Sequence, residues 1–201
     1  MNKKGLLITL IALVVLLAIA GVLYPKLSSG MQTQQLATTP PATTQAPEET
    51  GAPTEATQPE TIPAPDFTVL DWDGNEVNLS DYTGKPIVLN FWANGGGPCQ
   101  MEMPEFNAKY EALEGEVAFL MVHVGADVDA GKEKVTDGGY TFPVVFDKDS
   151  QAAAFYGVSA FPTSFFIDKE GNLQAYYVGA MDGELLQQGI DMIYAALSDG
   201  D

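Results

Sequence analysis

The residue best suited to covalent chemistry in this 201-residue chain is its single cysteine, Cys99. It follows the run Gly95-Gly96-Gly97-Pro98, where a glycine-rich break leads into a predicted helix. One cysteine excludes an internal disulfide framework and a cysteine-based structural zinc site. The chain has one histidine, His123, so a metal site with several histidines is excluded, and a serine–histidine catalytic pair would use the only histidine available. At the end of an apolar strand, such a histidine is typical of a packed or edge residue.

Other patterns that could bind ions or reduce peroxides are incomplete. Asp71, Asp73 and Glu76 lack the rest of a calcium-loop pattern, so we interpret them as a turn. The glycine run before Cys99 lacks the lysine and serine of a phosphate loop. A thiol peroxidase pattern requires threonine three residues before the cysteine, where Gly96 stands. We expect no metal and no cofactor, and we assign solvation or helix capping to the later loop aspartates Asp127, Asp129, Asp147 and Asp149.

The charge of the chain is strongly negative, with 9 lysines and no arginine against 27 acids and a net charge of −18. Residues 1–26 carry three lysines and no acid, residues 27–62 carry four glutamates and no cation, and residues 63–201 carry 6 lysines against 23 acids. Phosphate contacts need clustered cations, so this composition argues against a nucleic-acid partner. The acidity belongs to the predicted domain and repels anionic surfaces.

The first 62 residues predict an anchor and a spacer. Gly5–Tyr24 is uncharged and apolar, and its 20 residues span about 30 Å as a helix, the thickness of a bilayer core. Lys3 and Lys4 favour a cytoplasmic N-terminus with the rest of the chain outside. The alternative is a secreted protein whose signal peptide is cleaved after Ala20, although the apolar run continues to Tyr24. Residues 27–62 contain 28 Thr, Pro, Ala, Gln or Glu among 36, which predicts a disordered linker.

Residues 63–201 alternate strand and helix patterns. Two short runs, Phe67–Leu70 and Glu76–Leu79, flank Asp73-Gly74-Asn75 and predict a hairpin. Continuous or alternating apolar runs predict further strands at Ile87–Trp92, Val117–Val124, Phe142–Phe146, Thr163–Ile167 and Leu173–Val178. Helical spacing of apolar residues predicts one helix through Cys99, Met103, Phe106, Tyr110 and Leu113, and another over about Gly183–Leu197. This alternation indicates an α/β sheet with helices on both sides.

Several segments of this domain resemble, in order, the TlpA/ResA-like branch of the thioredoxin superfamily, of the AhpC/TSA redoxin type. They are Ala64-Pro65-Asp66-Phe67, Gly84-Lys85-Pro86-Ile87-Val88-Leu89-Asn90-Phe91-Trp92-Ala93, Pro98-Cys99-Gln100-Met101-Glu102-Met103-Pro104, Tyr156-Gly157-Val158 and Phe161-Pro162-Thr163-Ser164-Phe165-Phe166-Ile167-Asp168. The resemblance implies a thioredoxin-like fold with an N-terminal β-hairpin and a central mixed sheet flanked by helices. It also implies a membrane-tethered or secreted protein that exchanges disulfides with thiol-containing secreted proteins, apocytochrome c among them.

The chain departs from this family at the chemistry itself. Family members carry Cys-x-x-Cys where this chain has Gly96-Gly97-Pro98-Cys99, so Gly96 matches the attacking cysteine and Cys99 the resolving one. Gly95 also replaces the usual tryptophan. Exchange proceeds through a mixed disulfide that a second thiol resolves, and glycine supplies no sulfur. We therefore predict that this sequence cannot complete the dithiol cycle.

Cys99 has two interpretations. It can be a small buried apolar residue. Alternatively, the missing side chain at position 96 uncovers its sulfur, which could then bond to a partner or form a Cys99-linked homodimer.

Other site residues follow from the resemblance. Pro98 belongs to the motif, and Pro162 matches a cis-proline that shapes the site for an extended substrate, which Phe161 would contact. Glu102 matches an acid that tunes thiol acidity, with a solvated helix residue as its alternative.

Two hypotheses remain. The first is an extracytoplasmic, membrane-anchored thiol–disulfide oxidoreductase that lacks its nucleophile through engineering, recoding (a lost selenocysteine included) or natural drift. The second is a non-catalytic thioredoxin-fold module that binds polypeptides through the Pro162 groove. The two differ at position 96.

Overall fold

The alternating patterns form a seven-stranded mixed sheet in residues 61–195, the part of the chain that the computed structural model describes. The strand order is β2-β1-β5-β4-β3-β6-β7. The strands are β1 (Thr68–Leu70), β2 (Glu76–Asn78), β3 (Ile87–Trp92), β4 (Ala118–Val124), β5 (Val144–Asp147), β6 (Thr163–Ile167) and β7 (Leu173–Val178). The helices are the 3₁₀ helix η1 (Leu79–Tyr82) and the α-helices α2 (Gly97–Ala112), α3 (Val128–Gly138), α4 (Gln151–Phe155) and α5 (Gly183–Ala195).

The centre of the sheet is parallel and its edges are antiparallel. Strands β3, β4 and β5 run parallel, and α2 and α3 make the crossovers between them. On one side, β6 pairs antiparallel with β3 and β7 with β6; on the other, the β1–β2 hairpin joins β5 through one pair, Leu70 with Phe146. The predicted hairpin and mixed sheet are confirmed.

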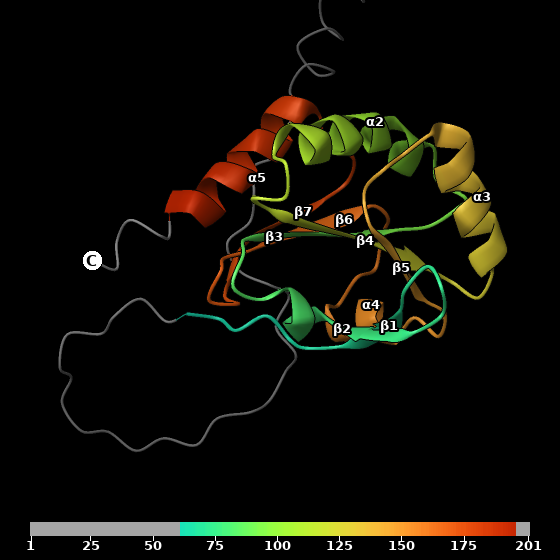
Figure 1. Cartoon of the computed structure of the whole chain (residues 1–201), viewed down its shortest axis with the longest axis horizontal. Coiled ribbons are helices and arrows are strands. Elements are labelled where there is room, and N and C mark those ends of the chain that lie inside the picture. Colours follow the sequence, from blue (N-terminus) through green and yellow to red (C-terminus); the bar gives the residue numbers. More distant parts are fainter. Residues whose placement is uncertain (1–60, 196–201) are drawn as a thin grey trace, which may run out of the picture. The chain divides into compact units, whose positions relative to one another are not determined.

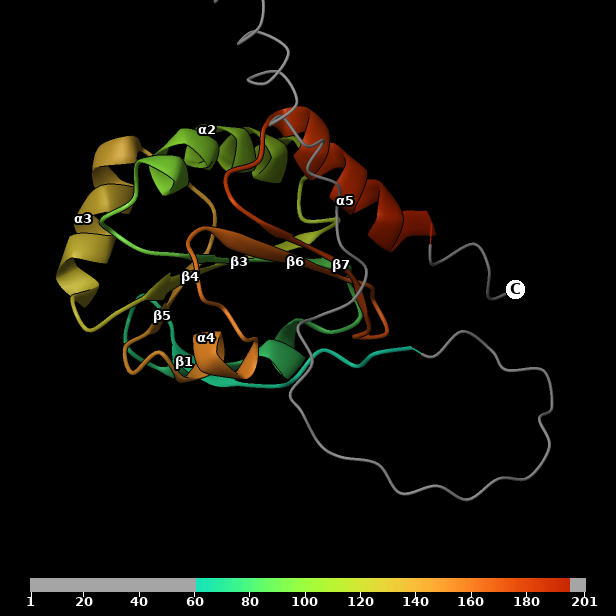
Figure 2. The same cartoon turned by 180° about the vertical axis from the view of Figure 1, so that it is seen from behind.

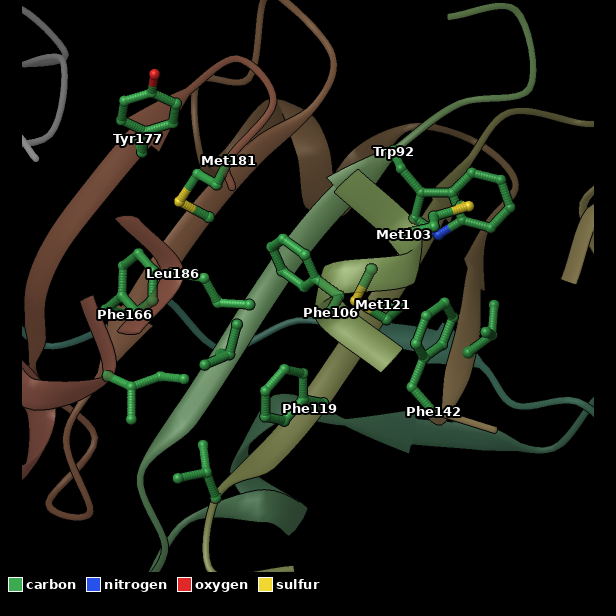
Figure 3. Close-up of a cluster of buried hydrophobic side chains, with 14 of the residues drawn as sticks. Trp92, Met103, Phe106, Phe119, Met121, Phe142, Phe166, Tyr177, Met181 and Leu186 are labelled. Carbon is green, nitrogen blue, oxygen red and sulfur yellow. The ribbon is translucent and has the colours of Figure 1, made fainter. Parts of the chain in front are cut away.

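Each face of the sheet covers its own core. Helices α2 and α5 lie over one face, and α4 and η1 lie over the other (Figures 1 and 2). Strand β3 is buried along its whole length, and its side chains alternate between the two cores. Figure 3 shows the first core, in which Trp92 lies close to Met103 and Leu186 lies near Phe166. Phe91 and its neighbours Ile87 and Leu89 fill the other core.

Three helices were not predicted from the sequence. The first, η1, begins at Leu79, which was predicted as the end of a strand. Helix α3 occupies a stretch interpreted as loop. It has few apolar residues, and its buried residues, Gly131 and Val135, are four positions apart on one face. Helix α4 is only five residues long. The capping interpretation of the aspartates holds, because Asp127 accepts a hydrogen bond from the Ala130 amide at 3.0 Å and Asp147 accepts from Gln151 and Ala153 at 2.9 Å each.

The predicted α2 is confirmed apart from its last position. The helix ends at Ala112, and Leu113 is its C-cap residue. In α5, Leu186, Ile190 and Ile193 are fully buried, as the periodicity predicts.

The predicted anchor and linker lie outside the described residues. Between residues 61 and 195, none of the helices combines the length and the apolar character that crossing a membrane requires.

Candidate active site at the start of helix α2

The glycine run before α2 sets the geometry of the site. Gly96 is the N-cap residue, with extended backbone angles of −104° and 118°, and Pro98 lies in the first turn where its missing N–H costs nothing. Cys99 therefore lies one turn inside the helix. A Cβ atom placed on Gly96 would be 3.3 Å from the Cys99 sulfur, whereas Cβ atoms on Gly95 or Gly97 would meet open space.

The Cys99 thiol is buried, with 1% of the residue exposed. It packs in the same apolar cluster as Trp92 and Met103. Burial raises the pKa of the thiol, and the nearby Glu102 carboxyl raises it further, against a hydrogen bond with the Ala93 backbone. The expectation that Gly96 uncovers the sulfur is therefore contradicted, because the surrounding core covers it. The interpretation of Cys99 as a buried apolar residue fits instead.

Glu102 is buried in the second turn of α2, with 1% of the residue exposed. Its Oε1 accepts a hydrogen bond from Asn90 Nδ2 at 2.8 Å, and its Oε2 accepts from the Met181 amide at 3.1 Å. Burial raises the pKa of this carboxyl to about 7, while both hydrogen bonds oppose the increase. The alternative of a solvated helix residue is wrong, because the side chain points into the sheet.

The cis-proline segment reaches the site through the pairing of β3 with β6. The Phe161–Pro162 peptide bond is cis, as the resemblance implies. Phe91 pairs with Thr163, so Pro162 lies beside the end of β3 and the loop that leads to Gly96. The Pro162 carbonyl accepts a hydrogen bond from the Gly179 amide at 2.9 Å. This pairing brings the cis-proline and the start of α2 to one end of the sheet.

Two large apolar side chains of this region face solvent. Met101, in the first turns of α2, is 75% exposed, and Phe161 is 37% exposed. Met101 belongs to α2, and Phe161 directly precedes the cis-proline and β6.

His123 is a packed residue, as the sequence indicates. Its ring lies 4.7 Å from the Trp92 ring and 5.8 Å from the Phe146 ring, measured between centroids. Neither ring nitrogen has a hydrogen-bond partner within the described part of the chain, and burial lowers the pKa of the imidazole.

Sequence reasoning missed the residues that hold Glu102. Asn90 is fully buried and donates to both Glu102 and the Ser164 hydroxyl, each at 2.8 Å. The available signal was an amide inside the otherwise apolar run Ile87–Trp92, because a polar side chain in a buried strand needs partners. The Met181 amide, which comes from a distant loop, left no signal in the sequence.

The chain matches known proteins along this domain. Residues 61–176 match the model of the AhpC/TSA family. The thiol-disulfide oxidoreductase ResA of Geobacillus thermodenitrificans is 39% identical over 132 residues, which cover 65% of this chain and 75% of that protein. ResA of Bacillus subtilis is 34% identical over 131 residues, which cover 65% and 73%.

Solved structures agree with the fold. A putative thiol:disulfide interchange protein DsbE from Chlorobium tepidum superposes with a TM-score of 0.61 and 31% identity, covering 67% of this chain and 96% of that one. A putative thioredoxin from Neisseria meningitidis gives a TM-score of 0.60 and 30% identity, covering 68% and 92%.

Proposed function

Because this chain belongs to the AhpC/TSA family, among thiol-disulfide oxidoreductases of the ResA kind, we propose that it is an extracytoplasmic member that lacks the attacking sulfur of the reaction. Gly96 stands where that sulfur belongs, and the remaining thiol of Cys99 cannot form an internal disulfide. In this form the chain cannot complete the exchange of a dithiol for a disulfide.

The observation that carries this proposal is the distance between position 96 and the Cys99 sulfur. A Cβ on Gly96 would lie 3.3 Å from that sulfur. In a disulfide, a Cβ lies about 3 Å from the partner sulfur, since the S–S bond is about 2.04 Å. The backbone at Gly96 therefore places a Cβ close to the distance from the Cys99 sulfur that a disulfide between positions 96 and 99 requires.

The chemistry explains why one sulfur is not enough. In disulfide reduction, an attacking thiolate bonds to one substrate sulfur and releases the other as a thiolate. The second thiol then attacks this mixed disulfide, so two electrons pass to the substrate and the protein is left with an internal disulfide. Here the only thiol, that of Cys99, is buried and its pKa is raised, so it is a poor first nucleophile.

The proposed location and partners rest on the sequence. The apolar segment Gly5–Tyr24 would anchor the chain, with its signal-peptide alternative, and residues 27–62 would hold the domain away from the membrane. The partners would be secreted proteins that contain thiols or disulfides, with apocytochrome c as one candidate. The negative domain would favour basic partners, mainly through the rate of encounter.

The decisive experiment restores a sulfur at position 96. We expect the unmodified chain to show no dithiothreitol-dependent reduction of insulin and Gly96→Cys to gain activity by orders of magnitude, as expected when a nucleophile is restored. Gly97→Cys is the matched control, because its Cβ meets open space and has no contact with Cys99. Insulin reduction by the unmodified chain would refute the proposal. A cysteine or selenocysteine codon at position 96 in the source genome would assign the natural protein to the active members.

A non-catalytic polypeptide-binding module is the second candidate. The observation that favours it is an intact cis-Pro162 segment with exposed Phe161 beside a site that lacks its nucleophile. Binding of a labelled, carboxymethylated insulin B chain, equal in the unmodified chain and in an inactive Gly96→Cys, would favour this function. Absence of binding would exclude it.

A further inference from the structure

Four segments that are distant in the sequence meet at the Glu102 carboxyl. Asn90 lies on β3, Ser164 on β6, Glu102 on α2, and Met181 in the loop before α5. Asn90 and Ser164 are directly opposite each other in the antiparallel β3–β6 pair. Asn90, Ser164 and Glu102 are all at most 1% exposed, so their hydrogen bonds form away from water.

The two N–H groups of the Asn90 amide are both used. One donates to the Ser164 hydroxyl oxygen and the other to Glu102 Oε1, each at 2.8 Å. The bond to Ser164 sets the direction of the amide, so its second N–H is aimed at the carboxyl. Asn90 Oδ1 has no partner in the described residues.

We propose that Asn90 is the positioning residue of this site: its amide, oriented by Ser164, donates to the Glu102 carboxylate and holds it in place. An N–H donor stabilises the carboxylate more than the protonated acid, so this hydrogen bond favours the ionised form of Glu102. The role in thiol exchange rests on the proposed function, since a thiol pair at positions 96 and 99 would use this carboxyl for proton transfer.

The same carboxyl is connected to the polypeptide groove. Its Oε2 accepts from the Met181 amide, and two residues earlier the Gly179 amide donates to the Pro162 carbonyl. The loop from Gly179 to Met181 is therefore held at one end by the cis-proline segment and at the other by Glu102. A carboxyl displaced by loss of Asn90 would release this loop as well as lose its own orientation.

The groups whose charges reach Glu102 are few. On its own helix the neighbour is the Cys99 thiol, and on β7 it is the Tyr177 hydroxyl; the Glu102 charge raises the pKa of both. Asn90, Ser164 and the Met181 amide are uncharged. Titration near neutral pH in this site is therefore assigned to Glu102, whose pKa lies at about 7.

The test is an NMR titration of the Glu102 carboxyl, by ¹³C-glutamate labelling of the full-length chain with Asn90→Leu. Leucine has a similar size and offers no hydrogen bond. We expect the Glu102 pKa to rise by about one unit, because the carboxylate loses a charge-assisted donor. We also expect exchange of the Met181 amide hydrogen to accelerate by about tenfold. Asn75→Ala is the matched control, since Asn75 lies in the hairpin turn and contacts Asp71.

Two further variants keep the inference falsifiable. Ser164→Ala removes only the acceptor that orients the Asn90 amide, so it should shift the Glu102 pKa in the same direction by less. In a Gly96→Cys background, Asn90→Leu should move the midpoint of the pH–rate profile by the shift seen in the titration. An unchanged Glu102 pKa in Asn90→Leu, or in Ser164→Ala should Asn90→Leu not fold, would overturn the positioning role. An inactive Gly96→Cys would instead refute the proposed function, because the titration does not depend on activity.

Discussion

Burial is the main cause of the pKa shifts of three titratable side chains, Cys99 and Glu102 on α2 and His123 on β4. For Cys99, Glu102 and His123, desolvation is the largest cause of the pKa shift, and each shift favours the uncharged form. Glu102 and His123 have opposite effects on how stability depends on pH. Glu102 binds a proton more readily in the folded chain than in the unfolded chain, whereas His123 binds one less readily.

At the scale of single residues, we predict that mild acid destabilises the unmodified chain through His123 and that His123→Leu removes this effect. The folded pKa of His123 lies below its unfolded value of 6.5. The unfolded chain therefore takes up the proton first, and the free energy of unfolding falls as the pH drops through about 6.5. Urea unfolding at pH 5, 6, 7 and 8 measures this slope, and the variant should lose it.

Glu102→Gln is the control for this prediction, because Glu102 changes stability with pH in the opposite direction to His123. Because the folded pKa of Glu102 is raised from 4.5 to about 7, its contribution to stability declines as the pH rises between these values. This variant should lose the decline and retain the His123 slope. Equal slopes for His123→Leu and the unmodified chain would contradict the assignment.

At the scale of secondary structure, α3 shows how a helix can form with few apolar residues. Its N-cap is Asp127, its end is Gly139 in the left-handed conformation with φ of 65°, and it packs closely on β4 at Gly131. A Cβ on Gly131 would lie 2.9 Å from the His123 ring, so only glycine allows this approach. Caps and one close contact thus substitute for a broad apolar face.

We predict that Asp127→Ala lowers the free energy of unfolding by about 1 kcal/mol, because the Ala130 amide loses its capping acceptor. Asp129→Ala is the matched control: Asp129 also lies in the first turn, but the cap bond comes from Asp127. Urea unfolding of both variants measures the difference. Equal losses would show that negative charge at the helix start, and not the cap, stabilises α3.

At the scale of the whole molecule, charge repulsion is largely uncompensated. The chain has a net charge of −18, and among residues 61–195 one ion pair forms, between the adjacent Lys169 and Glu170 at 3.6 Å. Acidic side chains therefore repel one another across the surface, which disfavours the compact state. Dissolved salt shortens the range of this repulsion.

We accordingly predict that the Tm rises by roughly 2–4 °C between 20 mM and 0.5 M sodium chloride, as screening removes part of the repulsion. Thermal unfolding at pH 7 measures this change. The same series at pH 4, where many carboxyls are protonated, should show a smaller rise. A Tm that stays constant or falls with salt at pH 7 would contradict the prediction.

Much of the fold was accessible from local patterns. Ile87–Trp92 is apolar except for Asn90 and became an inner strand with the predicted bounds, since such a run favours burial on both faces of a sheet. Leu186, Ile190 and Ile193 likewise marked the buried face of α5. Helix α3 was missed because it has few apolar residues and one of its two buried positions, Gly131, is a glycine, which does not mark an apolar face.

The sequence by itself determined that one thiol is present, that glycine stands at position 96 and that the acidity belongs to the domain, because these are matters of composition and order. Only the tertiary structure decided that Cys99 is covered and that Glu102 is buried against Asn90 and the Met181 amide. Burial and hydrogen bonding depend on which distant segments the sheet brings together. The pairing of β3 with β6 and the loop before α5 supply those partners, and no local pattern in the chain encodes them.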